Sequence, residues 1–251
     1  MNFAYWAAKS GCRSGIVSAI GRDPLGDELL SGISGLGVDL SALQVRDFPT
    51  GTVEVTLSAS GEPSYDIHRG VAWDNIQDTE EAYAMVRDAD ALCWGSLVQR
   101  TEACREAVLR LVDACPETAL KVFDVNMRQD YYTAETIEKS LERADVLKLN
   151  ENELPEILRL MGVDGIEAMM DRFNLSYVIY TLGADHSEVI GREERSVIPT
   201  PKVDVVSTVG AGDSFTATFV AEMLKGTPMR EAHAKAVEVS ANVCTRDGAI
   251  F

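Results

Sequence analysis

Residues 206–215 read VSTVGAGDSF, in which two glycines and an alanine precede an aspartate. Gly210, Ala211 and Gly212 let the backbone approach a ligand without interference from large side chains. The apolar periodicity that follows predicts a helix, whose first N–H groups are unpaired and carry the positive end of the helix dipole. The stretch therefore predicts a site for a phosphate or for a phosphoryl group in transfer. No lysine follows the glycines, so the motif is not a P-loop.

Asp213 stands directly after these glycines and has two possible roles. Aspartate is a favoured N-cap residue, so Asp213 could simply begin the helix. Alternatively, its carboxylate could accept the proton of a hydroxyl that attacks a γ-phosphorus, while neighbouring N–H groups stabilise charge on the phosphoryl oxygens. The four residues by themselves do not separate these two interpretations.

The chain from Ala89 onward alternates strand-like and helical patterns, which is typical of a parallel sheet covered on both faces. The predicted strands are ADALCWGSL, ALKVFDVN, ADVLKLN, LSYVIYTLG and the short run Val203–Thr208. The predicted helices are TEACREAVLRLVDAC, TAETIEKSLER, ENELPEILRLMG, IEAMMDRF, GDSFTATFVAEMLKG and MREAHAKAVEVSANVCT.

Residues 43–71 have a different pattern, because LQVRDF, GTVEVTLSAS and PSYDIHRGV alternate with period two between proline and glycine turns. This is typical of antiparallel hairpins. A small sheet of this kind has a face to cover, so we expect a β lid that closes over a ligand or packs on a second copy of the chain. We therefore expect residues 1–251 to form a single α/β domain with an inserted lid.

The composition excludes several classes of partner. The 251 residues carry a formal net charge of −17, which disfavours nucleic acid, and no apolar run is long enough to span a membrane. The five cysteines form no C-x-x-C pair, and no histidine has zinc-type spacing. We expect a cytoplasmic protein with reduced thiols.

Polar residues also follow the second predicted strand. Asp124, Asn126 and Arg128 come at its carboxyl end, where open α/β sheets bind ligands. Arg128 suits a phosphate or a sugar oxygen, although a surface arginine is the alternative. Trp73 and Asp74 could contact a sugar, and a tryptophan that only packs is the alternative.

Together these stretches resemble the PfkB or ribokinase-like family of sugar kinases. TVGAGDSFTATF is similar to the C-terminal signature of the family, and Asn2 with FAYWAAKSG resembles the end of its GG-x-x-x-N motif. SAIGRDPLGDELLSGISGLGVDL and TLGADHSEVI also match in order, and AWDNI, WGSLVQR, FDVNMR and LKLNENEL resemble the fructokinase branch. The resemblance implies a ribokinase-like three-layer α/β/α sheet, Rossmann-like, with a β lid.

The resemblance also implies ATP and Mg²⁺ as cosubstrates and assigns roles to individual residues. Asp213 would be the catalytic base beside an anion hole formed by Gly210, Ala211 and Gly212. Thr181, Gly183 and Asn242 would contact the nucleotide, and Asn2, Asn126 and Arg128 the sugar. Asn150 and Glu153 match an N-x-x-E motif that orders Mg²⁺. Their residue types alone favour a different interpretation, in which they cap the helix that follows.

Two departures from the family pattern affect these expectations. Ser207 replaces an aspartate that helps to bind a monovalent cation, so dependence on K⁺ is in doubt. In addition, the first strand and the two glycines of the GG motif are absent before Asn2. A chain truncated in this way is expected to be marginally stable and a poor kinase.

We therefore expect a kinase that phosphorylates fructose and forms a homodimer through the lid. Two alternatives remain at this stage. One is a related kinase for another acceptor, a nucleoside or a ketodeoxy sugar acid. The other is a kinase-like protein with weak or no catalysis that binds a ligand or partner.

Overall fold

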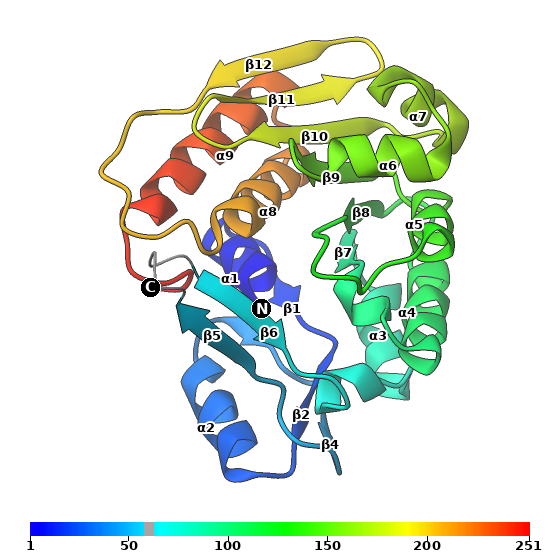
Figure 1. Ribbon diagram of the computed structural model, residues 1–251, viewed down its shortest axis with the longest axis vertical. Helices are drawn as coiled ribbons and strands as arrows, with labels where there is room; N and C mark the ends of the chain where they lie inside the picture. The colour runs from blue at the N-terminus through cyan, green and yellow to red at the C-terminus, as the bar shows by residue number, and fades with distance from the viewer. Residues whose placement is uncertain (58–62) are drawn as a thin grey trace.

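A six-stranded sheet forms the centre of the protein in a computed structural model, which describes residues 1–57 and 63–251 (Figure 1). The strand order is β12-β11-β10-β9-β8-β7, with β7 to β10 parallel and the other two antiparallel. The strands are β7 Ala91–Gly95, β8 Leu120–Asp124, β9 Val146–Asn150, β10 Tyr177–Leu182, β11 His186–Gly191 and β12 Arg195–Pro199. The four strands predicted between residues 89 and 183 are confirmed.

Helices cover both faces of this sheet, as the alternating pattern predicts (Figure 1). Along each strand successive side chains point to opposite faces. Val122, Val146 and Ile179 thus pack against Phe215 and Phe219 of helix α8, Ala211–Leu224. The opposite face packs on helices between the strands, where Phe123, Leu147 and Val178 join Val108, Ile137 and Ile157 in one cluster.

The six helices predicted in this half are confirmed. They are α4 Glu102–Ala114, α5 Ala134–Leu141, α6 Leu154–Met161, α7 Ile166–Phe173, α8 Ala211–Leu224 and α9 Met229–Cys244. The remaining helices are α1 Asn2–Lys9, α2 Pro24–Ile33 and α3 Glu80–Arg87, with 3₁₀ turns η1 Ala72–Asn75 and η2 Leu97–Gln99. None of the helices in the described ranges has the length and apolar character needed to cross a membrane.

The strand predicted at Val203–Thr208 is wrong. This segment is an irregular loop, and Val205 and Val206 expose 61% and 62% of their surface. The N–H groups of Val206 and Ser207 donate to the carbonyl of Cys244, at the end of α9, instead of to a neighbouring strand. Valines favour strands only where the pleated surface packs against something, and here nothing in the described chain covers them.

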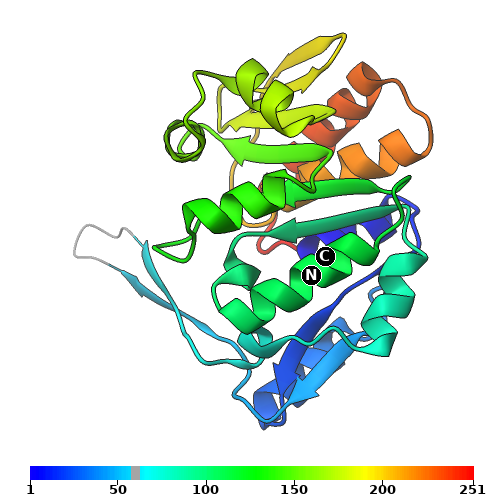
Figure 2. The same cartoon turned by 90° about the vertical axis from the view of Figure 1, so that its right-hand side faces the viewer.

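The small β segments lie apart from the six-stranded sheet (Figure 2). They are β1 Ser14–Gly15, β2 Ser18–Gly21, β3 Val38–Asp39, β4 Leu43–Arg46, β5 Val53–Leu57 and β6 Pro63–Ile67. The antiparallel hairpin predicted from the second and third runs is confirmed by β5 and β6, although its connection at 58–62 lies outside the described residues.

The expectation of an antiparallel strand at LQVRDF is wrong. β4 pairs with β2, and the pairing is parallel, with Ser18 opposite Leu43 and Gly21 opposite Arg46. The chain returns from β2 to β4 through α2, and a connection through a helix allows parallel pairing. Period-two alternation indicates that one face of a strand is covered, but it does not indicate the direction of the neighbouring strand.

Candidate active site

The glycine-rich turn lies at the N-terminus of α8. Gly210 is the N-cap with φ of +82°, a left-handed conformation that favours glycine, and a Cβ there would lie 2.4 Å from Cβ of Ala249. Among the described residues, the N–H groups of Gly212 and Asp213 donate to no protein acceptor, whereas the N–H of Ser214 donates to the Gly210 carbonyl. Two adjacent donors and the positive end of a fourteen-residue helix thus meet at this point.

Asp213 does not cap α8, so this interpretation is wrong. It is the third residue of the helix, and the N-cap Gly210 has no side chain that could form a cap bond. The half-buried carboxylate instead accepts a hydrogen bond of 2.8 Å from Nδ2 of Asn2 at the start of α1. Asn2 and Asp213 are 211 positions apart in sequence, and the packing of α1 on α8 brings them together.

Lys148 is a residue of this site that sequence analysis missed. It lies on β9 with 6% of its surface exposed, and its Nζ is 3.1 Å from Oδ1 of Asp124 on β8. Burial lowers the pKa of Lys148, but the carboxylates of Asp124, Glu153 and Asp213 outweigh it and raise the pKa above its ordinary value. The signal in the sequence was a lysine within the otherwise apolar run VLKLN.

Asn150 and Glu153 form reciprocal hydrogen bonds. Oδ1 of Asn150 accepts from the N–H of Glu153 at 3.1 Å, and Oε2 of Glu153 accepts from the N–H of Asn150 at 2.9 Å. This is the exchange of a capping box, formed here in the turn before α6. Oε1 of Glu153 accepts from the N–H of Met127 at 2.9 Å, so this carboxylate also ties the end of β9 to the loop after β8.

These two residues fit an indirect role toward Mg²⁺. Their side-chain oxygens already accept hydrogen bonds from backbone N–H groups, so each oxygen has at most one lone pair left for another donor or a metal ion. No group of three or more His, Cys, Asp and Glu side chains in the described chain could hold a metal ion. Mg²⁺ is commonly bound by one or two protein oxygens together with water and substrate phosphates. A site completed by nucleotide phosphates and water agrees with this donor set.

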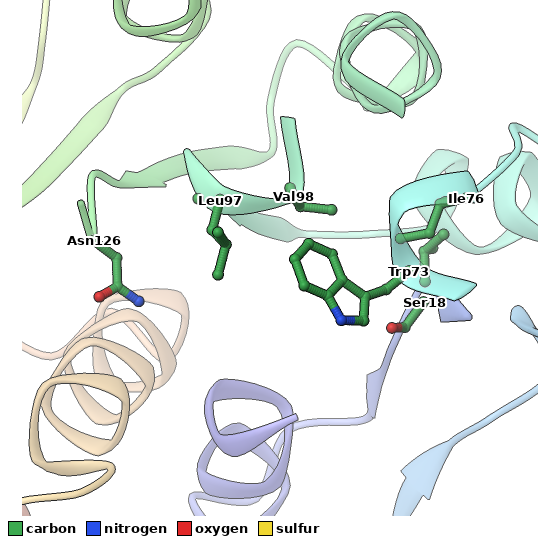
Figure 3. A pocket seen from close by; sticks show the side chains of 8 residues that line it. Ser18, Trp73, Ile76, Leu97, Val98 and Asn126 are labelled. Atoms are coloured by element: carbon green, nitrogen blue, oxygen red, sulfur yellow. The ribbon is translucent and has the colours of Figure 1, made fainter. Parts of the chain in front are cut away.

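A cavity of about 280 Å³ lies between β2, β7 and η1 (Figure 3). Asn126, Ser18 and the ring of Trp73 line it, together with the apolar side chains of Leu97 and Val98. Asn126 has φ of +41°, which turns the chain sharply after β8. Arg128 is not part of this wall: it is exposed, and its Nη1 donates to the carbonyl of Met127. The structure therefore places Asn126 in the wall of this cavity and Arg128 at the surface.

A second cavity of about 660 Å³ lies between α9 and the chain that follows β12. Asn242 lines it, next to the apolar side chains of Ile198, Val203 and Val237. Thr181 and Gly183 do not line it. The carbonyl of Thr181 accepts from the N–H of Glu151 at 3.1 Å, and Gly183 lies against the same residue, so both border the turn at Asn150.

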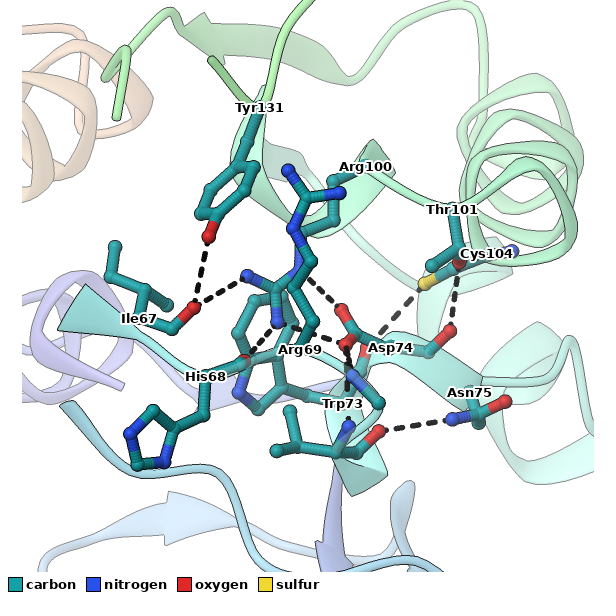
Figure 4. A network of polar contacts seen from close by, with 12 residues as sticks. Ile67, His68, Arg69, Trp73, Asp74, Asn75, Arg100, Thr101, Cys104 and Tyr131 are labelled. Atoms are coloured by element: carbon teal, nitrogen blue, oxygen red, sulfur yellow. Dashed lines mark hydrogen bonds and ion pairs between the residues drawn. The ribbon is translucent and has the colours of Figure 1, made fainter. Parts of the chain in front are cut away.

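Asp74 does not line the first cavity, unlike its neighbour Trp73. Its carboxylate pairs with both Nε and Nη2 of Arg100, at 2.6 and 2.8 Å, and the two side chains are only 2% and 3% exposed (Figure 4). The guanidinium of Arg100 stacks over the rings of Trp73 and Tyr131 and donates to the carbonyls of Ile67 and His68 at the end of β6. Asp74 and Arg100 thus fasten the hairpin to the body of the protein.

Comparisons with known proteins agree with this arrangement. The model of the pfkB family of carbohydrate kinases matches residues 1–251. Fructokinase-1 from Zea mays is 27% identical over 268 residues, which cover 99% of this chain and 82% of that protein. A sugar kinase from Pyrococcus horikoshii, crystallised in complex with ATP, has a TM-score of 0.87 and 27% identity over 99% of this chain and 82% of that chain. Ribokinase from Thermotoga maritima shares the fold, with a TM-score of 0.81 and 23% identity over 100% of this chain and 82% of that chain.

Proposed function

The chain belongs to the pfkB family of carbohydrate kinases and has the ribokinase-like α/β fold, and from this premise we propose that it phosphorylates a hydroxyl group of fructose. It is an ATP-dependent sugar kinase. Fructose as the acceptor is supported by the similarity to the Zea mays fructokinase and by the stretches WGSLVQR and FDVNMR.

Asp213 is the proposed catalytic base, and one observation carries this assignment. Its half-buried carboxylate is held by Asn2 next to two N–H groups that have no protein acceptor among the described residues. In the proposed step an acceptor hydroxyl gives its proton to Asp213 while its oxygen bonds to the γ-phosphorus of ATP. The bond from that phosphorus to the β-phosphate oxygen breaks, and ADP leaves. The N–H groups of Gly212 and Asp213 stabilise charge on the phosphoryl oxygens.

The two cavities fit the two substrates. The larger one, with Asn242 and apolar walls, suits an adenine ring, which needs a flat apolar slot and a few polar contacts. The smaller one suits a sugar that stacks on Trp73 and hydrogen-bonds Asn126 and Ser18. Mg²⁺ would neutralise charge on the ATP phosphates, and Asn150 and Glu153 would order the water around it.

Residues 43–71 are proposed to act as a lid and as the contact of a homodimer. Val45, Phe48 and Val53 expose 46%, 41% and 51% of their surface, which is costly for apolar side chains in water. A second copy packed on them would cover this surface. Sedimentation at micromolar concentrations tests the dimer, and a monomer at every concentration would contradict it.

An ADP-release assay over a panel of acceptors tests the proposed substrate. Fructose is expected to give the highest kcat/KM among fructose, ribose, nucleosides and a ketodeoxy sugar acid. A higher value for a nucleoside or a sugar acid would identify that acceptor instead. No ADP release above the ATP-only rate with any of them would support the non-catalytic alternative.

The five free cysteines fit a reducing cytoplasm, where ATP is available, as the place of action.

A further inference from the structure

Lys148 occupies a position on β9 where an apolar side chain would be expected. Side chains along a strand alternate between faces, and Val146, two residues earlier, packs on α8. Lys148 therefore points toward α8 as well. Its register partner on β8 is Asp124, and its partner on β10 is Ile179. The ammonium is thus enclosed between the middle of the sheet and the helix that carries the glycine-rich turn.

The ammonium of Lys148 reaches the backbone of that turn. A Cβ added to Gly212 would lie 3.2 Å from Nζ and 3.6 Å from Cε of Lys148. A side chain at this position would be tight against the ammonium, so Gly212 and Lys148 lie in close contact. Nζ consequently lies close to Gly212, whose backbone N–H has no protein acceptor among the described residues.

An ion pair with Asp124 alone does not explain why the Lys148 ammonium also lies next to Gly212 in the glycine-rich turn. A charge buried near several carboxylates acts on all of them, because a low-dielectric interior screens little. Asp124 is the direct partner, and Glu153 and Asp213 also interact electrostatically with the ammonium. Lys148 therefore lies between the proposed base, the proposed Mg²⁺ turn and the anion-binding N–H groups.

We propose that Lys148 is a positioning residue for phosphoryl transfer. Its ammonium adds a fixed positive charge behind the N–H groups of Gly212 and Asp213 and holds the Asp213 carboxylate in place. The effect acts through the turn, and it is largest where the transferring phosphoryl group carries the most charge. This inference rests on the proposed role of the glycine-rich turn, and it does not depend on which sugar is the acceptor.

Three variants separate this role from simple charge neutralisation. Lys148→Met keeps an unbranched side chain one atom shorter and removes the charge, which leaves Asp124 buried without its partner. The double variant Lys148→Met with Asp124→Asn removes both charges and so relieves that penalty. Lys121→Met is the matched control, because Lys121 lies near the start of β8, at the opposite end of this strand from Asp124.

Melting temperature, kcat and nucleotide binding are then compared. Lys148→Met is expected to lower the melting temperature, and the double variant to restore it. In both variants kcat should stay lower by roughly 10²-fold, the usual effect of losing one stabilising donor, with the KM of the sugar nearly unchanged. Lys121→Met should match the wild type. Recovery of kcat in the double variant, or an unchanged kcat in Lys148→Met, would overturn the proposal.

Calorimetry of ADP with Mg²⁺, with and without aluminium fluoride, provides a measurement that needs no acceptor. Aluminium fluoride mimics the transferring phosphoryl group, so the wild type should bind ADP more tightly when it is present. Both Lys148 variants should bind ADP alone as the wild type does and lose most of this gain. A full gain in the variants would overturn the role of Lys148 and leave the role of the turn standing. No gain in the wild type would overturn the role of the turn, and this inference with it.

Discussion

The proposed phosphate side and the proposed acceptor side of this kinase are built in different ways. On the phosphate side, β8, β9 and α8 meet in the buried centre of the protein, where Lys148, Asp124 and Glu153 are nearly inaccessible. On the acceptor side, the β2–β4 pair and the β5–β6 hairpin carry exposed apolar residues, and Gly26 is the only buried residue of α2. The proposed phosphate side thus lies in the packed centre of the protein, whereas these elements of the proposed acceptor side are more exposed.

The largest expected effect concerns the proposed base on the phosphate side. Asp213→Asn keeps the shape of the side chain and a hydrogen bond to Asn2 but cannot accept the proton. It should lower kcat by roughly 10²- to 10⁴-fold and leave folding and ATP binding nearly intact. Steady-state kinetics with calorimetry of ATP binding measure both. Turnover near that of the wild type would exclude Asp213 as the base.

The next effect concerns the junction between the two sides. Arg100→Met leaves Asp74 buried and unpaired, which should lower the free energy of unfolding by about 3–5 kcal/mol. Urea denaturation measures this change. Arg159→Met is the control, because the Arg159–Glu156 pair is 67% exposed on the arginine side and such pairs contribute about 0–1 kcal/mol. Equal losses in the two variants would contradict the role given to Arg100.

A smaller effect is expected within the acceptor cavity. Trp73→Ala removes the aromatic wall, so it should raise the KM of the sugar by about tenfold, the equivalent of one lost stacking contact of about 1.4 kcal/mol. The KM of ATP should stay the same, because the nucleotide cavity has no wall in common with this one. Kinetics with each substrate varied in turn provide the comparison. Similar changes in both KM values would show that the two sides are not separate.

The smallest effect concerns Ser207, in the loop before the glycine-rich turn. Its hydroxyl accepts from the N–H of Val209 at 3.2 Å and offers a cation only a dipole, where a carboxylate would offer a full charge. Replacing K⁺ by a large inert cation should therefore change the wild-type rate by only about twofold or less, while Ser207→Asp should introduce dependence on K⁺. An increase of roughly tenfold on adding K⁺ to the wild type would contradict this expectation.

Prediction from sequence succeeded where local pattern and tertiary packing agree. The strands β7 to β10 and the helices α4 to α9 have strong periodicity, and burial on both faces reinforces it. It failed at Val203–Thr208 and at β4, because exposure and strand direction depend on neighbours that the local pattern does not specify. Lys148 was missed for a related reason: only the fold brings it to Gly212, 64 positions later in the chain.

The expected site residues also divide into those that the fold brings together and those that it leaves apart. Asn2 and Asp213 were both expected in the site, and the packing of α1 on α8 brings them into contact. Arg128, Thr181 and Gly183 have suitable residue types at strand ends, yet their side chains or backbone lie outside the two cavities. Residue type and position at a strand end predict which edge of the sheet a residue occupies, and the loop conformation decides which way it points.

Transfer from γ-labelled ATP to fructose tests the central claim most directly, namely that this chain directs the phosphoryl group to a sugar hydroxyl. With the wild-type protein, labelled phosphosugar should appear in a one-to-one ratio with ADP, and the Asp213→Asn variant should slow both together. ADP formed with the label released as inorganic phosphate would mean that water is the acceptor. That result, or labelled phosphosugar formed equally fast by Asp213→Asn, would contradict the account.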